Sequence, residues 1–230
     1  MRLAVQDGAT EGWSPAAAND RVVPSQPLLA IDLLRRLFLF GPSDQVLGLA
    51  LTAAEAVGGS PALANAVDAL GIATEAGIDS GERWMNELAA EFTRLIVGPA
   101  QTPAVPYASF YLSPSRLVMT EETLAVRRRY VDAGVARRGD VRIPDDHLGI
   151  ELDFLYFLER EVALAQAIGD DATVQTARGR RADFVRGHLS KWVPRFASDL
   201  LGATSHDFIR AAVALLLALL VDDGASQLDV

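Results

Sequence analysis

Apolar side chains recur at every third or fourth position through most of this chain, and glycine or proline stands where each row stops. The first row consists of Leu28, Ile31, Leu34, Leu37 and Phe38. Since a helix turns once in about 3.6 residues, this spacing gathers the apolar side chains on one face. Gly41 and Pro42 then interrupt the row. The pattern predicts a helix over residues 27–40 and favours helices over strands for the whole chain.

The same reasoning predicts the other helices. They lie between Ser43 and Gly58, over about 61–76, between Gly81 and Gly98, from Thr120 to Tyr130, from Leu148 to Ala165, over about 172–189 and over about 205–221. Prolines at 103, 106 and 114 rule out a long helix in residues 100–115, so an ordered loop packed over the core is expected there. We also expect the proline at 194 to turn the chain.

These elements predict an all-α protein, a single globular bundle of about eight to ten helices. Residues 1–26 are rich in glycine, proline and polar residues and are expected to form a flexible N-terminal arm, followed by a helical domain over residues 27–225. The glycine- and arginine-rich stretch 132–147 is a candidate hinge between an N-terminal lobe (27–131) and a C-terminal lobe (148–225).

Charge and composition exclude several classes of function. The net charge of −9 argues against a nucleic-acid partner and suits a basic partner, although acidity also serves solubility alone. The chain has no cysteine, which excludes disulfides and thiolate chemistry and fits the cytoplasm. Its longest apolar run, residues 211–221, is shorter than the roughly 20 residues needed to cross a bilayer, so no stable membrane insertion is expected.

Residues 143–154 combine a proline with several side chains that can carry chemistry. Asp145 and Asp146 can cap the following helix, and His147 and Glu151 are spaced to share one of its faces. One alternative is a metal-dependent enzyme that uses Asp146, His147 and Glu151. His188 stands in an unrelated context, and neither a serine nucleophile elbow nor a phosphate-binding glycine loop is present. We therefore predict no enzymatic activity, no metal and no cofactor.

Three segments together resemble a known family. They are residues 91–99 followed by 106–111, residues 144–152 preceded by 119–121 and 126–130, and residues 188–196. In order and spacing they are similar to the TorD/DmsD/NarJ-type family of cytoplasmic chaperones for molybdenum-containing reductases. The resemblance implies an all-helical protein that binds the catalytic subunit of a reductase, and usually its twin-arginine leader peptide, until the molybdenum cofactor is loaded.

A leader peptide of arginines and an apolar segment needs carboxylates beside an apolar groove. The candidate peptide-binding residues are Asp145, Asp146, His147, Glu151, Tyr107, Phe110 and Tyr111. We expect residues 106–111 and 143–149 to face one cleft, while the three aromatic residues can equally cover the core. A monomer or a domain-swapped dimer fits a hinged chain. An all-α adaptor without a redox client remains an alternative.

Overall fold

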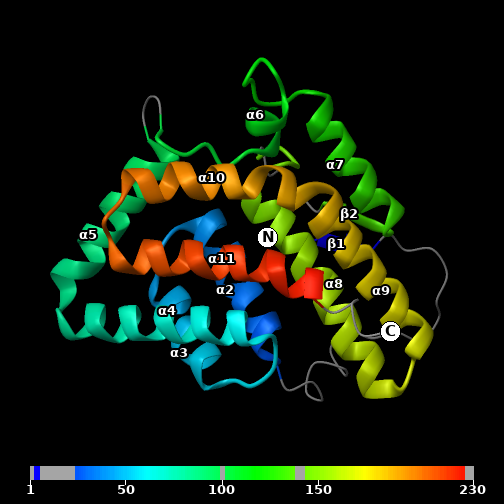
Figure 1. Ribbon diagram of the computed structural model, residues 1–230, viewed down its shortest axis with the longest axis horizontal. Coiled ribbons are helices and arrows are strands. Elements are labelled where there is room, and N and C mark those ends of the chain that lie inside the picture. Colours follow the sequence, from blue (N-terminus) through cyan, green and yellow to red (C-terminus); the bar gives the residue numbers. More distant parts are fainter. Residues whose placement is uncertain (1–2, 6–23, 99–101, 138–142, 226–230) are drawn as a thin grey trace.

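The computed structural model describes residues 3–5, 24–98, 102–137 and 143–225, and it confirms the all-α class (Figure 1). The α-helices are α2 (Gln26–Phe40), α3 (Asp44–Glu55), α4 (Pro61–Asp79), α5 (Glu82–Phe92), α6 (Ala108–Leu112), α7 (Glu121–Asp132), α8 (Leu148–Ile168), α9 (Asp171–Phe184), α10 (Ser190–Ala203) and α11 (Asp207–Ala225). The π-helical turns η2 (Thr93–Val97) and η3 (Val185–Leu189) continue α5 and α9. The short strands β1 (Leu3–Val5) and β2 (Val135–Arg137) pair antiparallel.

Local sequence signals set the ends of the first helices. Ser25, Ser43 and Ser60 each accept a hydrogen bond through the side-chain oxygen from the amide three residues later, which satisfies an unpaired donor of the first turn. Gly41 ends α2 with a φ of 80°, a conformation that glycine adopts without steric cost. Each of the three serines stands directly before the first residue of its helix.

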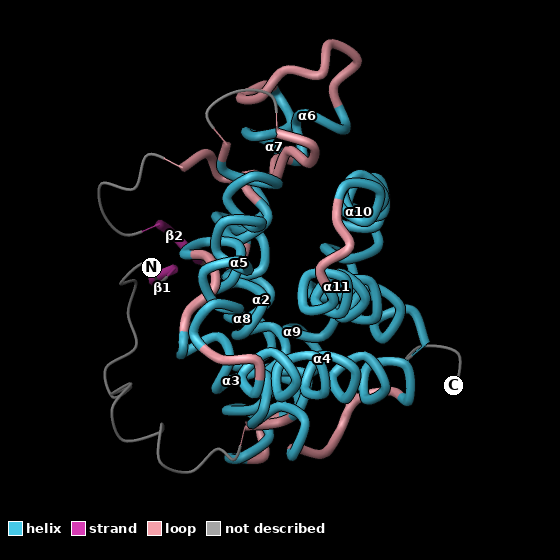
Figure 2. Tube along the Cα trace, turned by 90° about the vertical axis from the view of Figure 1, so that its left-hand side faces the viewer, coloured by secondary structure: helices cyan, strands magenta, loops and turns pink. Residues whose placement is uncertain are grey.

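One apolar core joins the two predicted lobes. In Figures 1 and 2, α10, α11 and α4 follow one another from top to bottom, with α2 and α8 beside them. The core includes Leu34 and Leu63 from the N-terminal part and Leu155, Trp192 and Leu216 from the C-terminal part, each at most 1% exposed. A division into two lobes stays a prediction, and residues 138–142 of the proposed hinge lie outside the described residues.

Helices α2 and α8 approach each other closely. A Cβ atom on Gly149 would lie 2.6 Å from Cγ of Leu39, so only glycine fits at this crossing. The buried guanidinium of Arg35 donates to Oδ1 of Asp153 at 2.8 Å and lies 4.2 Å from the ring centre of Tyr156. These contacts fix the first turns of α8, where the candidate site begins.

One expectation from the sequence differs from the structure. Pro194 does not turn the chain, because it lies inside α10, one turn after its start. The π-helical turn η3 directly precedes α10, so the hydrogen-bonding pattern already changes there, which is where a missing amide is best tolerated. The flexible N-terminal segment expected over residues 1–26 stays a prediction, because residues 1–2 and 6–23 lie outside the described part. Leu3–Val5 pairs with Val135–Arg137.

Residues 108–132, which comprise α6, α7 and the loop between them, lie at one end of the molecule and are called the arm below (Figure 2). Helix α6 packs against α10, and α7 packs against α6 and β2. The connecting loop exposes Leu117, Val118 and Met119, and it holds Arg116 and Met119 at positive φ. The arm therefore presents three consecutive apolar side chains to solvent on a loop.

Candidate functional site

Residues 106–111 and 143–149 lie directly against each other and are called the junction below. The amide of Ala108 donates to the carbonyl of Asp146, and the amide of Leu148 donates to the carbonyl of Pro106, both at 2.9 Å. These bonds pair Tyr107 with His147 in an antiparallel bridge. The structure thus brings together the two segments that the sequence assigned to one cleft. Because their backbones are hydrogen-bonded to each other, the segments pack side by side and do not face each other across a cleft.

Asp146 is completely buried and fastens the arm instead of capping α8. Its carboxylate accepts hydrogen bonds from the amide of Ser109 at 2.8 Å and from the hydroxyl of Thr123 at 2.9 Å. One carboxylate therefore binds the first turn of α6 and the first turn of α7. The expectation that Asp145 or Asp146 caps α8 is wrong, because the carboxylate of Asp146 is already committed to these donors.

His147 provides the cap of α8. Its Nδ1 accepts a hydrogen bond from the amide of Gly149 at 3.1 Å, and its ring meets that of Tyr107 edge to face at 5.0 Å. Burial lowers the pKa of His147 from 6.5 to about 4, although the nearby Asp146 opposes this shift. The imidazole is therefore neutral at physiological pH, which leaves Nδ1 free to accept the amide proton.

Glu151 lies on α8 but does not join His147 in a shared site. It is fully buried, and its two carboxylate oxygens contact Nε2 of His188 at 2.7 Å and Nε1 of Trp192 at 3.1 Å. Burial raises the pKa of Glu151, and the charge and hydrogen bond of His188 oppose that rise. His188 was taken from the sequence as unrelated, yet it is the principal partner of this carboxylate.

Asp145 is the predicted acid closest to solvent. Its carboxylate forms an ion pair with Nε of Arg127 at 2.9 Å, in which the aspartate side chain is 7% exposed and the arginine side chain 62% exposed. Its carbonyl accepts a hydrogen bond from the hydroxyl of Tyr130 at 2.9 Å. The backbone of Asp145 is thus anchored in the core, while its side chain holds a group that faces water.

The three aromatic residues of the junction differ in exposure. Tyr107 and Phe110 are half-buried, and the guanidinium of Arg116 lies 4.7 Å from the ring centre of Phe110. Tyr111 is buried, and its hydroxyl donates to Asp199 at 3.0 Å. Burial raises the pKa of both tyrosines. Only Tyr107 and Phe110 keep ring surface that a partner can reach.

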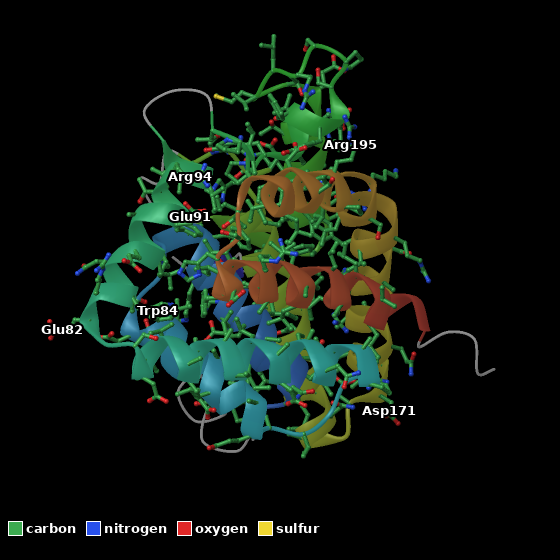
Figure 3. All side chains as sticks on the ribbon, turned by 60° about the vertical axis from the view of Figure 1, so that its left-hand side comes forward. Glu82, Trp84, Glu91, Arg94, Asp171 and Arg195 are labelled. Atoms are coloured by element: carbon green, nitrogen blue, oxygen red, sulfur yellow. The ribbon has the colours of Figure 1, made fainter. Side chains whose placement is uncertain are left out.

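Helix α10 supports the arm through Tyr111. The ring of Tyr111 stacks on Trp192 at 5.8 Å, and the guanidinium of Arg195 donates to the carbonyl of Tyr111 at 2.6 Å. Figure 3 shows Arg195 on α10, at the end of the molecule that carries α6 and α7. The third resembling segment, residues 188–196, therefore holds the junction in place from behind.

The first resembling segment has a structural task of its own. Arg94 donates to both carboxylate oxygens of Glu91 at 2.8 Å, and a further donation to the carbonyl of Ala203 ties η2 to the end of α10 (Figure 3). Thr204 donates to Glu91 at 2.8 Å. This cluster connects α5 and η2 to the end of α10 and lies outside the junction.

The geometry does not support the metal-dependent alternative. In the parts of the chain that the structure describes, no three histidine, cysteine or acidic side chains form a group that could hold a metal ion. Asp146 faces Ser109 and Thr123, and Glu151 faces His188 and Trp192, so the proposed ligands do not converge. The described helices also include none that is long and apolar enough to cross a membrane.

Sequence reasoning missed Arg127, Thr123, His188 and Trp192 as partners of the predicted acids. For the last two a signal was available, since His188 and Trp192 are four residues apart and thus share a helical face. Thr123 and Ser109 carry no such signal, because nothing in the sequence indicates that a carboxylate from residue 146 reaches two other helices.

Comparisons with known proteins show which proteins this chain is similar to. The chaperone protein TorD of Vibrio parahaemolyticus is 29% identical over 139 residues, which cover 60% of this chain and 63% of that protein. TorD of Vibrio cholerae El Tor is 32% identical over 137 residues, covering 60% of each chain. TorD of Aliivibrio fischeri is 29% identical over 161 residues, covering 70% of this chain and 73% of that protein. The first two of these matches thus span less than two thirds of the relatives' lengths.

A crystal structure from Archaeoglobus fulgidus, described as a candidate redox enzyme maturation protein, aligns with a TM-score of 0.40 and 18% identity over 76% of this chain and 97% of its own. Residues 60–198 match the family described as nitrate reductase delta subunit, which is more than half of the chain. This protein therefore belongs to the nitrate reductase delta subunit family, and its predicted resemblance to the TorD-type chaperones is confirmed.

Proposed function

We propose that this protein is a cytoplasmic chaperone for the catalytic subunit of a molybdenum-cofactor reductase. It binds the subunit and its twin-arginine leader peptide and holds them during cofactor insertion, without catalysing a reaction itself. Its family and the relatives named TorD chaperones support the role. The side chains of the junction support the proposed binding of the leader peptide.

The observation that carries the proposal is that two arginines of the chain itself occupy the exposed side of the junction. Arg127 pairs with the carboxylate of Asp145, and Arg116 lies over the ring of Phe110. These are two ways in which proteins bind a guanidinium, by an ion pair and by a cation–π contact. The same two partners can therefore bind the paired arginines of a leader peptide.

Exchange of one arginine for another at these positions is energetically feasible. An ion pair with an exposed partner contributes only about 0–1 kcal/mol, so a peptide arginine replaces Arg127 at little cost. Arg116 is exposed, so its guanidinium can leave the ring of Phe110 and return to water at little cost. The leader's apolar segment then covers the half-buried rings of Tyr107 and Phe110.

The buried members of the predicted site act by positioning. Asp146 binds both helices of the arm, His147 caps α8, and Glu151 holds η3 and α10 through His188 and Trp192. Tyr111 fixes α6 to α10. These four side chains are all engaged within the protein, so none is free to bind a peptide arginine. We propose that they hold in place the surface that carries Asp145, Tyr107 and Phe110.

Isothermal titration calorimetry with a synthetic twin-arginine leader peptide tests this proposal. We expect Asp145→Asn and Phe110→Leu each to weaken binding by about fivefold, and Asp68→Asn, an exposed acid on α4, to leave it unchanged. Thermal unfolding of each variant checks that the fold is intact. Binding of the peptide to a folded Asp145→Asn variant with wild-type affinity contradicts the assigned role of Asp145.

The client itself is tested by affinity purification from native lysate. The proposal predicts that one large molybdoenzyme subunit co-purifies with the protein, in the form that lacks its cofactor. Co-purification of partners that include no redox subunit favours the adaptor alternative.

A further inference from the structure

The outer face of α7 combines exposed apolar side chains with arginines. Val126 and Tyr130 point into the core and are 1% and 2% exposed, which fixes the rotation of the helix about its axis. Leu124 and Val131, seven residues apart, are 51% and 55% exposed. A helix this short gains its stability from its buried face, which leaves the two exposed apolar residues available to a partner.

A shallow hollow lies along this face. Its volume is about 250 Å³, and it is lined by Leu124, Arg127, Arg128, Val131 and Asp132. Residues three, four and seven positions apart are neighbours on a helix, so the two arginines stand between the two apolar side chains. The hollow thus has apolar ends and a basic centre, and the acidic Asp132 stands beside Val131 at one end.

The two arginines of the hollow contrast with the net charge of −9 that the whole chain carries. Asp145 holds Arg127 in place, whereas Arg128 is exposed and, within the described ranges, makes neither a hydrogen bond nor an ion pair. The helix dipole favours arginines in the last turns of α7. It does not account for exposed leucine and valine beside them.

We propose that this face of α7 docks an acidic amphipathic segment of a partner protein. Two apolar side chains of the segment contact Leu124 and Val131, and a carboxylate between them pairs with Arg128. The proposed function is needed only to name the partner, which is then the folded body of the reductase subunit and not its basic leader.

Size and charge exclude the other ligand classes. Pockets for small molecules have volumes of about 300–1,000 Å³ and are largely enclosed, whereas this hollow is smaller and shallow. Anionic membranes attract clusters of about 4–8 basic residues, and nucleic acids need a comparable number of phosphate contacts. Two arginines match one or two carboxylates of a polypeptide.

Fluorescence anisotropy with a labelled helical probe tests this inference. The probe is an alanine-based peptide with two leucines seven residues apart and two glutamates between them, and a second probe carries lysines in place of the glutamates. The full-length protein should bind the glutamate probe and not the lysine probe. We expect Arg128→Glu to weaken binding of the glutamate probe by about fivefold and to allow binding of the lysine probe. Leu124→Ser should weaken binding of the glutamate probe to a similar extent.

Arg178→Glu, the same charge change on the exposed face of α9, is the matched control and should leave binding unchanged. Equal binding of both probes, or equal losses in Arg128→Glu and Arg178→Glu, overturns the inference. Binding to phosphatidylglycerol vesicles in place of the probe also overturns the inference, because it points to a membrane. A change of oligomeric state in Leu124→Ser does so too, because it points to a second copy of the chain. Leader-peptide calorimetry on Arg128→Glu should be unchanged, which separates this inference from the proposed function.

Discussion

The helical bundle and the arm are stabilised in different ways. In the bundle, leucine, phenylalanine and tryptophan side chains from α2, α8, α10 and α11 fill one continuous core. The arm also buries Val126 and Tyr130, but its two helices are held together by the carboxylate of Asp146 and attached to α10 through Tyr111. Hydrogen bonds are directional and can be lost by changing a single group, so we expect the arm to lose its structure more readily than the bundle.

The largest expected effect is in the bundle. Leu34 on α2 is completely buried, and Leu34→Ala should lower the free energy of unfolding by about 3–4 kcal/mol, because it leaves a cavity in a close-packed core. Urea denaturation measures this loss. Leu34→Met, which conserves volume, should cost less than about 1.5 kcal/mol. Equal, small losses for both variants contradict a tightly packed bundle.

The second prediction uses pH to separate the junction from the bundle. The unfolded chain binds a proton on His147 near pH 6.5, whereas the folded chain does so only near pH 4. Between these values the unfolded state holds more protons, so the free energy of unfolding should fall as pH decreases from 6.5 to 4, by about 3 kcal/mol in total.

Other groups titrate in the same window, so a matched variant isolates the imidazole. Asparagine at 147 can still accept the amide hydrogen bond of Gly149 but does not ionise. The difference in stability between the wild type and His147→Asn should therefore shrink or change sign towards pH 4. A difference that does not depend on pH contradicts the assignment to His147.

The third prediction concerns the fastening of the arm. Asp146→Ala leaves the amide of Ser109 and the hydroxyl of Thr123 without their acceptor and should cost about 2 kcal/mol. Hydrogen exchange should speed up in α6 and the first turn of α7 and remain slow in α2 and α11. Thr123→Val removes one of the two bonds and should cost about 1 kcal/mol. Uniform acceleration across the bundle contradicts independent stability of the two regions.

The smallest effect is expected at Arg127. Arg127→Gln removes an ion pair whose arginine is 62% exposed and should change the free energy of unfolding by less than about 0.5 kcal/mol. Because it also removes a competitor for Asp145, affinity for a twin-arginine leader peptide should rise about twofold to fivefold. Calorimetry decides, and a reduced affinity means that Arg127 itself contacts the peptide.

The difference between the two regions also explains what the sequence could predict. Apolar spacing and glycine or proline stops located the helices of the bundle, since burial acts on every residue of a face. Hydrogen bonds between distant segments leave no periodic trace. Asp146 reads as a cap for the helix that follows it, but it caps α6 instead, 37 residues earlier in the chain.

The same limit applies within the site. The sequence identified residues 106–111 and 143–149 as partners, yet it placed Glu151 beside His147, whereas the fold turns this carboxylate to His188 and Trp192. A spacing of four residues shows that two side chains share a face but not which neighbour that face meets. Whether Asp145, Tyr107 and Phe110 bind a peptide stays a prediction for calorimetry.

The tight crossing of α2 and α8 makes positions 39 and 149 a matched pair. A methyl group on residue 149 would overlap the side chain of Leu39 and lie 3.1 Å from its backbone nitrogen, so trimming residue 39 should relieve most, but not all, of the cost of an alanine at 149. In an alignment of relatives, these two columns are accordingly expected to vary in concert, large against small.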